Sequence, residues 1–284
     1  MVYILEGGKF SCLGPIREKI AKKERVLVEL LFLGTGTSVG VPMIGCDCPV
    51  CTSPDPRNQR SRSSLLIRHE SAHVLIDTTP ELRQQALRFG LRRVDAVLLT
   101  HTHADHIFGF DDLRRFNHLQ GRPVPVYGTP ETLDNIRTIF AYAFRPPQPG
   151  GSKPEVELHP VQGAFRLGRL TFTPVPVLHG RMTVTGYRVG RVAYVTDVSH
   201  IPPSSRELLR GLDVLILGAL RFRPHPTHLS IEEALAVIDD LKPRRAYLTH
   251  LSHEVDHAAA NGQLPPPVQL AYDGLRIQVP DPED

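Results

Sequence analysis

Short apolar runs bounded by polar residues recur along the chain and predict strands. In the first half they lie at residues 26–33, 65–67, 74–76, 95–100 and 124–127. In the second half they lie at residues 170–178, 192–196 and 245–249. Helical segments are predicted between them, so the pattern favours an α/β (α+β) fold.

The predicted helices carry their own start and stop signals. One begins near Pro80 and ends at Gly90, because proline suits a first helical turn and glycine a helix end. Another follows Ser230, which forms a capping box with Glu233. A short helix is predicted at residues 111–118. A longer one at residues 130–144 has a predicted buried stripe of Leu133, Ile136, Phe140 and Phe144.

The apolar run at residues 95–100 ends in a cluster of metal-binding side chains. The next six residues include His101, His103, Asp105 and His106. In an extended backbone His101 and His103 project to the same side and can bind one cation, while Asp105 and His106, beyond a turn, can face a second. Imidazole together with carboxylate suits zinc, manganese or iron. We therefore predict a metal centre on this loop.

Three later strands also end in a metal-binding side chain. These side chains are His179, Asp197 and His250, after the runs at 170–178, 192–196 and 245–249. A single histidine is more often structural, but three strand ends of this kind favour one shared site. The segments Leu99-Thr100-His101 and Leu248-Thr249-His250 are also similar, in agreement with a fold of two similar halves.

Composition limits the classes of protein that need to be considered. A chain of 284 residues with 41% hydrophobic content can bury a large core in one domain. Its net charge of +3 is no signature of nucleic-acid binding. No apolar run is long enough for a membrane helix, and the amino terminus lacks the layout of a signal peptide. We therefore expect a cytoplasmic protein.

Three of the four cysteines lie within six residues of each other, at Cys46, Cys48 and Cys51. This spacing favours a metal site over a disulfide framework. A closed tetrahedral zinc site needs a fourth ligand from elsewhere in the chain. The remaining cysteine, Cys12, has no role that we can assign. It lies in residues 1–24, which we interpret as an extension ahead of a single domain at residues 25–284.

These motifs together resemble those of one family. The glycine-rich segment 34–38, the cysteine cluster, the histidine motif at 101–106 and the segment 248–253 resemble the PhnP-type phosphodiesterases of the metallo-β-lactamase superfamily. These enzymes hydrolyse phosphoribosyl cyclic phosphate and are related to tRNase Z. The resemblance spans residues from about 26 to the end and implies a four-layer αββα sandwich with two metal ions at one edge.

The resemblance also implies roles for single residues. One metal ion would be held by His101, His103 and His179, and the other by Asp105, His106 and His250, with Asp197 as a bridge. His253 would complete a structural zinc site with Cys46, Cys48 and Cys51. His228 would be the general acid, and Asp105 is counted with it among the catalytic residues. Asp77, which could otherwise be a plain helix cap, would support the ligand loop.

The implied reaction is hydrolysis of a small or cyclic phosphodiester by a hydroxide shared between two cations, manganese, zinc or iron. An RNA-processing nuclease of the tRNase Z type is an alternative, favoured if arginines at 57–62 or 92–93 line the site. It is disfavoured because the chain has no long basic arm for gripping tRNA. A non-hydrolytic metal-binding protein is a second alternative. The family also suggests a homodimer.

Overall fold

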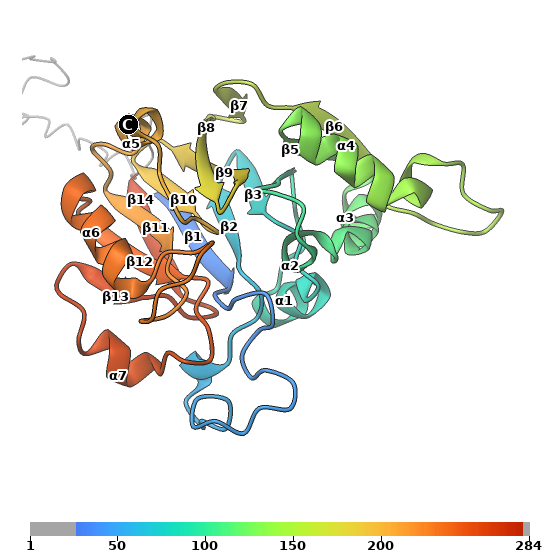
Figure 1. The fold of residues 1–284 in the computed structure, drawn as a ribbon. Coiled ribbons are helices and arrows are strands. Elements are labelled where there is room, and N and C mark those ends of the chain that lie inside the picture. The colour runs from blue at the N-terminus through green and yellow to red at the C-terminus, as the bar shows by residue number, and fades with distance from the viewer. Residues whose placement is uncertain (1–26, 281–284) are drawn as a thin grey trace, which may run out of the picture.

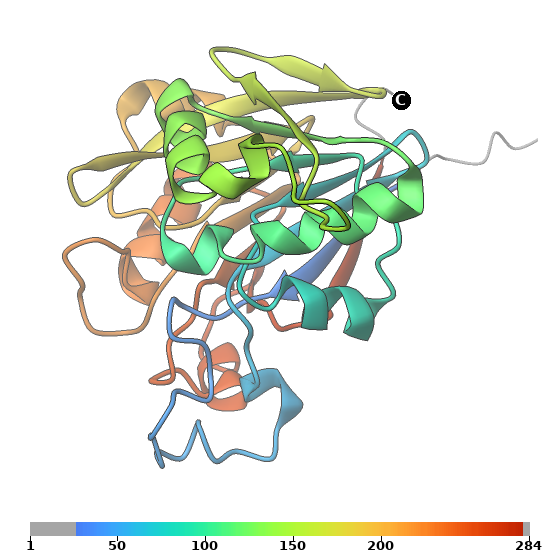
Figure 2. The same ribbon diagram turned by 90° about the vertical axis from the view of Figure 1, so that its right-hand side faces the viewer.

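The computed structural model describes residues 27–280 and folds them into four layers (Figure 1, Figure 2). Two seven-stranded sheets pack face to face, and helices cover both outer faces. The predicted αββα sandwich is therefore confirmed. The predicted extension at residues 1–24, with Cys12, lies outside the described residues, so the domain boundary at residue 25 stays a prediction.

Each sheet is formed mainly from one half of the chain. The first has the order β14-β1-β2-β3-β4-β5-β6. Its strands are β1 (Leu27–Gly34), β2 (Ser64–His69), β3 (Ala72–Ile76), β4 (Ala96–Leu98), β5 (Val124–Gly128), β6 (Val156–Pro160) and β14 (Arg276–Pro280). The second has the order β13-β12-β11-β10-β9-β8-β7. Its strands are β7 (Phe165–Leu167), β8 (Leu170–His179), β9 (Met182–Val189), β10 (Val192–Val195), β11 (Val214–Gly218), β12 (Arg245–Thr249) and β13 (Val268–Leu270).

The helices divide between the two outer faces in the same way. The first sheet is covered by α1 (Leu82–Phe89), α2 (Ala104–Ile107), α3 (Leu113–Gln120) and α4 (Pro130–Ile139). The second is covered by α5 (Pro203–Leu208), α6 (Ile231–Leu241) and α7 (His257–Asn261). Short 3-10 turns lie at η1 (Pro56–Asn58), η2 (Phe110–Asp112) and η3 (Ala141–Phe144). The predicted capping box of Ser230 and Glu233 is present at the start of α6.

Alternation along the strands explains how both faces of a sheet can be buried. In β1, Leu30 and Phe32 pack between the two sheets, whereas Leu31 and Leu33 pack under the helices. Successive side chains of a strand point to opposite faces, so a strand covered on both sides is apolar throughout. The short continuous apolar runs of the sequence have this origin.

Strand direction brings the chemically interesting loops to one edge. Strands β3, β4 and β5 pair in parallel, and so do β10, β11 and β12. Strand β8 runs in the same direction as β10, because each is antiparallel to β9. The loops that follow these strands therefore leave from the carboxyl ends of their sheets, where ligands bind in open α/β sheets.

The prediction for residues 130–144 was partly wrong. Helix α4 ends at Ile139, and η3 follows it. Phe140 stacks on Phe110 with ring centroids 4.7 Å apart and anchors the turn. Beyond it the chain leaves the body of the protein and forms a projecting segment before β6 (Figure 1). Phe144 is therefore 38% exposed rather than part of the buried stripe.

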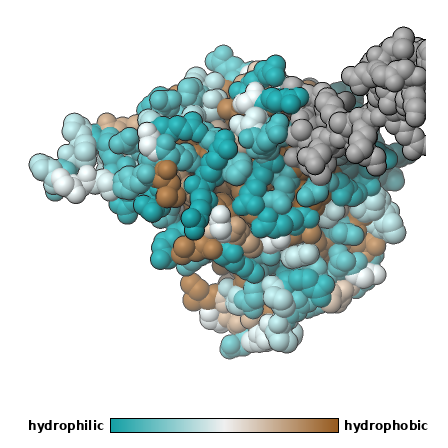
Figure 3. Space-filling view, turned by 180° about the vertical axis from the view of Figure 1, so that it is seen from behind, coloured by the Kyte–Doolittle hydropathy of each residue, from teal (hydrophilic) through white to brown (hydrophobic). Residues whose placement is uncertain are grey.

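In the part of the chain that the structure describes, no helix combines the length and apolar character needed to span a bilayer. Seen from behind, the surface is mostly hydrophilic with small apolar spots (Figure 3). Single exposed apolar side chains of this kind are normal for folded proteins.

Candidate metal centre

The predicted metal-binding side chains lie at the carboxyl ends of four strands. His101 follows β4, and His103 precedes α2, which carries Asp105 and His106. The other three come from the second sheet: His179 ends β8, Asp197 follows β10, and His250 follows β12. Segments far apart in the sequence therefore meet at one edge of the sandwich.

These side chains form two groups of three. In each group the possible ligand atoms lie within 4.8 Å of one another: His101, His103 and His179 in the first triplet, and Asp105, His106 and His250 in the second. This is the grouping that the resemblance implied. Most of the side chains are buried, but His103 is exposed and opens the first triplet to solvent.

Asp197 lies between the two triplets. One carboxylate oxygen is 3.1 Å from Nε2 of His106, and the other is 3.3 Å from Nε2 of His250. The same carboxylate belongs to a compact donor group with His101 and to another with His179. Asp197 therefore contacts both triplets, which is the position of a bridging ligand.

Asp77 determines which ring nitrogen of two histidines is free. His106 Nδ1 donates to Asp77 Oδ2 at 2.7 Å, so in the neutral ring Nε2 is the nitrogen that can bind a cation. The Thr100 hydroxyl also donates to Asp77, so its oxygen accepts the hydrogen bond from His101 Nδ1 at 3.0 Å. Nε2 of His101 is then free as well. Asp77 is thus not the N-cap of α1, and it hydrogen-bonds to the segment that carries His101 and His106.

A backbone carbonyl fixes the ring of His179 in the same way. The Nδ1–H of His179 donates to the carbonyl oxygen of Thr227 at 2.7 Å. A carbonyl can only accept, so the proton is on Nδ1 and Nε2 is available as a ligand. Thr227 precedes His228, and its hydroxyl lies 3.2 Å from Nδ1 of His225.

Backbone strain is concentrated around the same cluster. Within residues 27–280, four residues other than glycine have positive φ angles, and three of them are Asp77 (63°), Asp197 (50°) and His250 (61°). The left-handed region costs free energy for side chains of this kind and persists where the surrounding structure imposes it. Such strain is typical of functional sites.

Charge and hydrogen bonding both fit divalent cations. Nε2 of His101 and Nε2 of His106 are buried and have no hydrogen-bond partner. Burial lowers the pKa of His106, but Asp197, Asp77 and Asp105 outweigh burial and raise that pKa well above its ordinary value. Buried polar groups are normally paired, and three carboxylates around one ring favour positive charge. Metal ions would satisfy both requirements.

Comparison with known proteins agrees with this geometry. A family model described as the Beta-lactamase superfamily domain matches residues 72–251. A solved structure described as a new diphosphatase from the PhnP family is 45% identical in sequence, with a TM-score of 0.84. The alignment covers 89% of this chain and 97% of that one. The chain belongs to the PhnP family of the beta-lactamase superfamily.

Two curated relatives extend the comparison. An octanoyltransferase from Porphyromonas gingivalis is 41% identical over 251 residues, but the chain spans only 50% of its length. A ribonuclease Z from Methanopyrus kandleri is 28% identical in an alignment of 310 positions that covers 90% of this chain and 99% of that protein. The PhnP-family fold and the donor set together are those of a metal-dependent hydrolase.

His228 lies next to the triplets without belonging to either. Its Nδ1 is 3.8 Å from a carboxylate oxygen of Asp197. Its ring stacks on His250, with centroids 5.0 Å apart, and lies 4.6 Å from the ring of His179. Burial and the neighbouring His250 lower the pKa of His228 to about 3, so the ring is neutral at pH 7 when no substrate is bound.

The predicted cysteine cluster forms around His253. Possible ligand atoms of Cys46, Cys48, Cys51 and His253 lie within 4.8 Å of one another. Nδ1 of His253 is 3.3 Å from the sulfur of Cys46 and 3.4 Å from that of Cys48. Hydrogen bonds from the Cys51 N–H and from His253 lower the pKa of Cys48 to about 6. This favours the thiolate, the form that binds metal.

Three of the arginines that could have favoured a nuclease make other contacts or line another surface. Arg57 pairs with Asp55. Arg60 is buried and donates to the carbonyl oxygens of Ser252 and Val255. Arg92 lines a groove between α1 and α3 to which none of the proposed metal ligands contributes. The condition that favoured RNA as a substrate is therefore not met by these residues.

Sequence reasoning missed the hydroxyl and carbonyl groups that orient the ligands. Thr100 is adjacent to His101, and the same Thr-His pair recurs at residues 249–250. This repeat could have indicated that the threonine has a role beside the histidine. Thr227 lies 48 residues from His179, and no local pattern indicates that its carbonyl accepts a hydrogen bond from that ring. Thr37 was missed in the same way, although its hydroxyl is 3.4 Å from Nε2 of His250.

Proposed function

We propose that this protein is a dinuclear metal-dependent phosphodiesterase that hydrolyses a small or cyclic phosphodiester, such as a phosphoribosyl cyclic phosphate. The observation that carries the proposal is the position of Asp197 between two triplets of donors. A single cation would need only one triplet. Two triplets joined by one carboxylate fit a pair of cations.

The seven side chains would hold the two cations. Hydrogen bonds from the non-ligating ring nitrogens would keep the histidines oriented. When bound, such cations neutralise the charge of a phosphodiester and activate water. Manganese, zinc and iron all suit imidazole and carboxylate ligands. Asp77 and the Thr227 carbonyl accept hydrogen bonds from Nδ1 of His106 and of His179 and so fix the orientation of the two rings. Exposed His103 marks the side from which a substrate can reach the triplets.

His228 is the proposed general acid for the leaving oxygen. Its ring is the imidazole closest to Asp197 outside the two triplets, at 3.8 Å. The anionic phosphodiester would lie beside this ring and oppose the effect of burial, because a nearby negative charge favours the protonated imidazole. The protonated ring could then donate to the leaving group. Loss of such a donor typically lowers the rate about a hundredfold or more.

A structural zinc site at the cysteine cluster is part of the same proposal. Three cysteines and His253 provide the four ligands of a closed tetrahedral site. The bound ion would join the loop after β1 to the loop after β12, which also carries His250. We propose that it stabilises the second triplet by fixing this loop.

Diphosphate esters are the second candidate substrate, because the 45% identical structure is described as a diphosphatase. RNA is a third, suggested by the ribonuclease Z relative. A non-hydrolytic metal protein is also an outcome that the experiment below can reveal. A cytoplasmic location and a homodimer stay predictions from the sequence.

The experiment compares ribose cyclic phosphates, cyclic dinucleotides, diphosphate esters and a short RNA as substrates, with manganese, zinc and iron supplied in turn. We expect the cyclic phosphodiesters to be hydrolysed fastest and the His103→Ala variant to be inactive. His118→Ala, which changes an exposed histidine on α3, serves as the matched control. Faster hydrolysis of diphosphates or RNA would replace the proposed substrate. Absence of hydrolysis with every cation would contradict a hydrolase.

A further inference from the structure

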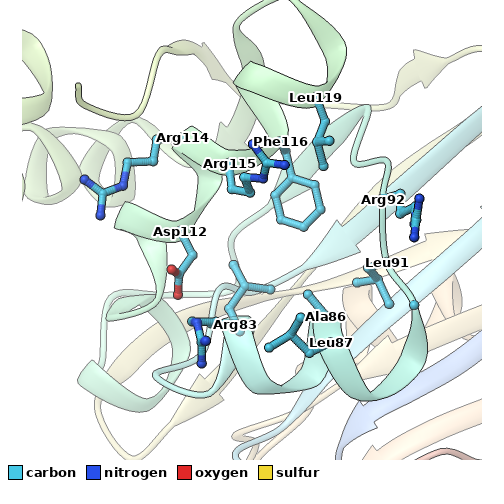
Figure 4. Close-up of a pocket in the computed structure, with 12 residues that line it drawn as sticks. Arg83, Ala86, Leu87, Leu91, Arg92, Asp112, Arg114, Arg115, Phe116 and Leu119 are labelled. Carbon is cyan, nitrogen blue, oxygen red and sulfur yellow. The ribbon is translucent and has the colours of Figure 1, made fainter. Parts of the chain in front are cut away.

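A groove of about 670 Å³ separates helices α1 and α3 on the outer face of the first sheet (Figure 4). Its floor is apolar and includes the buried side chains of Leu82, Leu91 and Phe116. Leu87 and Leu119 also line it but are 68% and 47% exposed. Two exposed leucines beside one apolar floor form a surface that water solvates poorly.

Arginines surround this floor. Arg83, Arg92, Arg114 and Arg115 all line the groove. Arg114 pairs with Asp111 at 3.1 Å. Within residues 27–280, no ion pair is formed by Arg83, Arg92 or Arg115, although Arg83 is near enough to Asp112 to lower the pKa of that carboxyl group. Four arginines therefore line the groove against one acidic residue, which leaves an excess of positive charge for an anionic partner.

Only one acidic residue lines the groove in the described part of the chain, and this is Asp112. Burial and the neighbouring Asp111 raise the pKa of Asp112, whereas Arg114 and Arg83 lower it. Four arginines outnumber this single carboxylate along the groove. The groove therefore combines an apolar floor with a positive rim. An occupant that matches it must be apolar along its centre and acidic at its edges.

We propose that the groove docks an amphipathic helix of a partner protein, with apolar residues on one face and acidic residues beside them. Helices of this kind bind apolar grooves through residues spaced three and four positions apart. Their carboxylates can pair with arginines in a bidentate manner. Leu87 would pack under the helix, and Arg83 and Arg115 would pair with its acidic edges.

Other occupants fit less well. An RNA backbone would use the arginines but would leave Leu87 and Leu119 in water. A free inorganic anion would use one or two arginines and none of the apolar floor. A protein helix is the class that uses both features. The relative from Porphyromonas gingivalis is about twice as long as the stretch it shares with this chain, so this fold also occurs joined to further polypeptide.

The test selects ligands without assuming a sequence. A displayed library of random peptides of about 16 residues, long enough for about four helical turns, is selected on the whole protein. Peptides that bind the support without protein are removed. We expect the remaining peptides to be acidic and to carry apolar residues at helical spacing. Enrichment of basic or neutral peptides, or no enrichment, would overturn the proposal.

Affinities of the selected peptides then locate the site. We expect the double arginine variant, Arg83→Glu/Arg115→Glu, to bind at least about tenfold more weakly, because charge-assisted hydrogen bonds are lost. Leu87→Gln should also weaken binding. Arg244→Glu and Ile139→Gln, which change exposed residues elsewhere, should bind like the wild type. Unchanged hydrolase activity and melting temperature would show that all variants are folded.

Two further ligands test other classes of occupant: an RNA, and an apolar chain that ends in one carboxylate. A short RNA and dodecanoate are each titrated against the wild type and the double arginine variant. Arginine-dependent binding of either one, with no peptide selected, would overturn the proposal. Equal affinity of a selected peptide for the wild type and the double variant would do the same. The outcome is independent of the proposed phosphodiesterase activity, since no metal ligand lines the groove.

Discussion

Asp77 belongs to neither triplet but hydrogen-bonds to the segment that carries four of their six side chains and follows β4. Its carboxylate accepts hydrogen bonds from the backbone N–H and the hydroxyl of Thr100 and from Nδ1 of His106. An asparagine has only one acceptor atom in the same place, so at least one of these donors would face an NH₂ group.

We therefore expect Asp77→Asn to bind the active-site cations about 10- to 100-fold more weakly, the usual cost of losing such a partner. Titration of metal-free protein with Mn²⁺ measures the affinity directly. Asp134→Asn, which changes an exposed carboxylate on α4, is the control. Wild-type affinity in the Asp77 variant would show that the ligand rings are oriented by other groups.

Asp273 is a buried carboxyl group outside the metal centre. It accepts hydrogen bonds from the Thr35 hydroxyl at 2.8 Å and from the Ser61 N–H at 2.7 Å. Burial outweighs these bonds and raises the pKa of Asp273 to about 6. Between pH 4 and pH 6 the folded protein therefore holds a proton that the unfolded chain has lost.

This difference makes the free energy of unfolding fall as the pH rises from about 4 to about 6, by about 3 kcal/mol, and then level off. Asp273→Asn removes the ionisable group, so its stability should lack this fall. Urea unfolding of the wild type and the variant at several pH values measures both curves. Parallel curves would mean that the pKa of Asp273 is not raised.

At the scale of helices and strands, the sequence predicts an element through its own residues and their immediate neighbours. The strands before His101, Asp197 and His250 were predicted because a buried strand is a short apolar run, and its end is marked by the polar ligand. Edge strands gave no such signal. Strand β6 alternates between half-buried and exposed residues, and its place in the sheet depends on pairing with β5.

Packing between distant elements could not be predicted in the same way. The end of α4 at Ile139 depends on Phe140 stacking on Phe110, a contact across 30 positions. The tautomer of His179 depends on the carbonyl of Thr227. Both contacts exist only once the sheets and loops are assembled, so the sequence could indicate candidate ligands but not the orientation of their rings.

The loop after β1 provides a prediction about the cysteine cluster. Cys48→Ser removes one of four ligands, so the protein should lose about one equivalent of zinc and keep its active-site cations. Elemental analysis after dialysis measures both. Cys12→Ser, which changes none of the four proposed ligands, should keep the full zinc content. A zinc content of the Cys48 variant equal to that of the wild type would show that the cluster does not bind this ion.

The contact between the loop before α1 and the loop after α2 leads to a second prediction at this scale. The Thr78 N–H donates to the His106 carbonyl, and the Gly109 N–H donates to the Thr78 carbonyl, at 2.8 and 2.9 Å. A Cβ atom at Gly109 would lie 2.0 Å from the Thr79 carbonyl oxygen. The two loops are therefore close because residue 109 has no side chain.

Gly109→Ala should destabilise the protein by about 1–3 kcal/mol or more, the usual cost of overpacking, and should weaken cation binding through His106. Gly163→Ala is the matched control, because a Cβ atom there meets nothing within 4 Å. Urea unfolding and Mn²⁺ titration of both variants measure the two effects. Equal stability of the two variants would contradict this account of the loop contact.

At the scale of the whole molecule, the metal centre joins the two sheets. Four of its proposed ligands follow β4 in the first sheet, and three follow strands of the second. Hydrogen bonds cross the interface beside them, from the Tyr187 hydroxyl to the Leu99 carbonyl at 2.7 Å and from the Thr185 N–H to the Thr100 carbonyl at 3.0 Å. Complete triplets therefore require both halves of the fold.

The central claim is that two cations at this edge hydrolyse a phosphodiester. The most direct test removes metal from the active site and follows hydrolysis of bis(p-nitrophenyl) phosphate as Mn²⁺ is added back. We predict that the rate rises until two equivalents are bound beyond the ion at the cysteine cluster. Saturation at one equivalent, or no hydrolysis at any loading, would contradict the account.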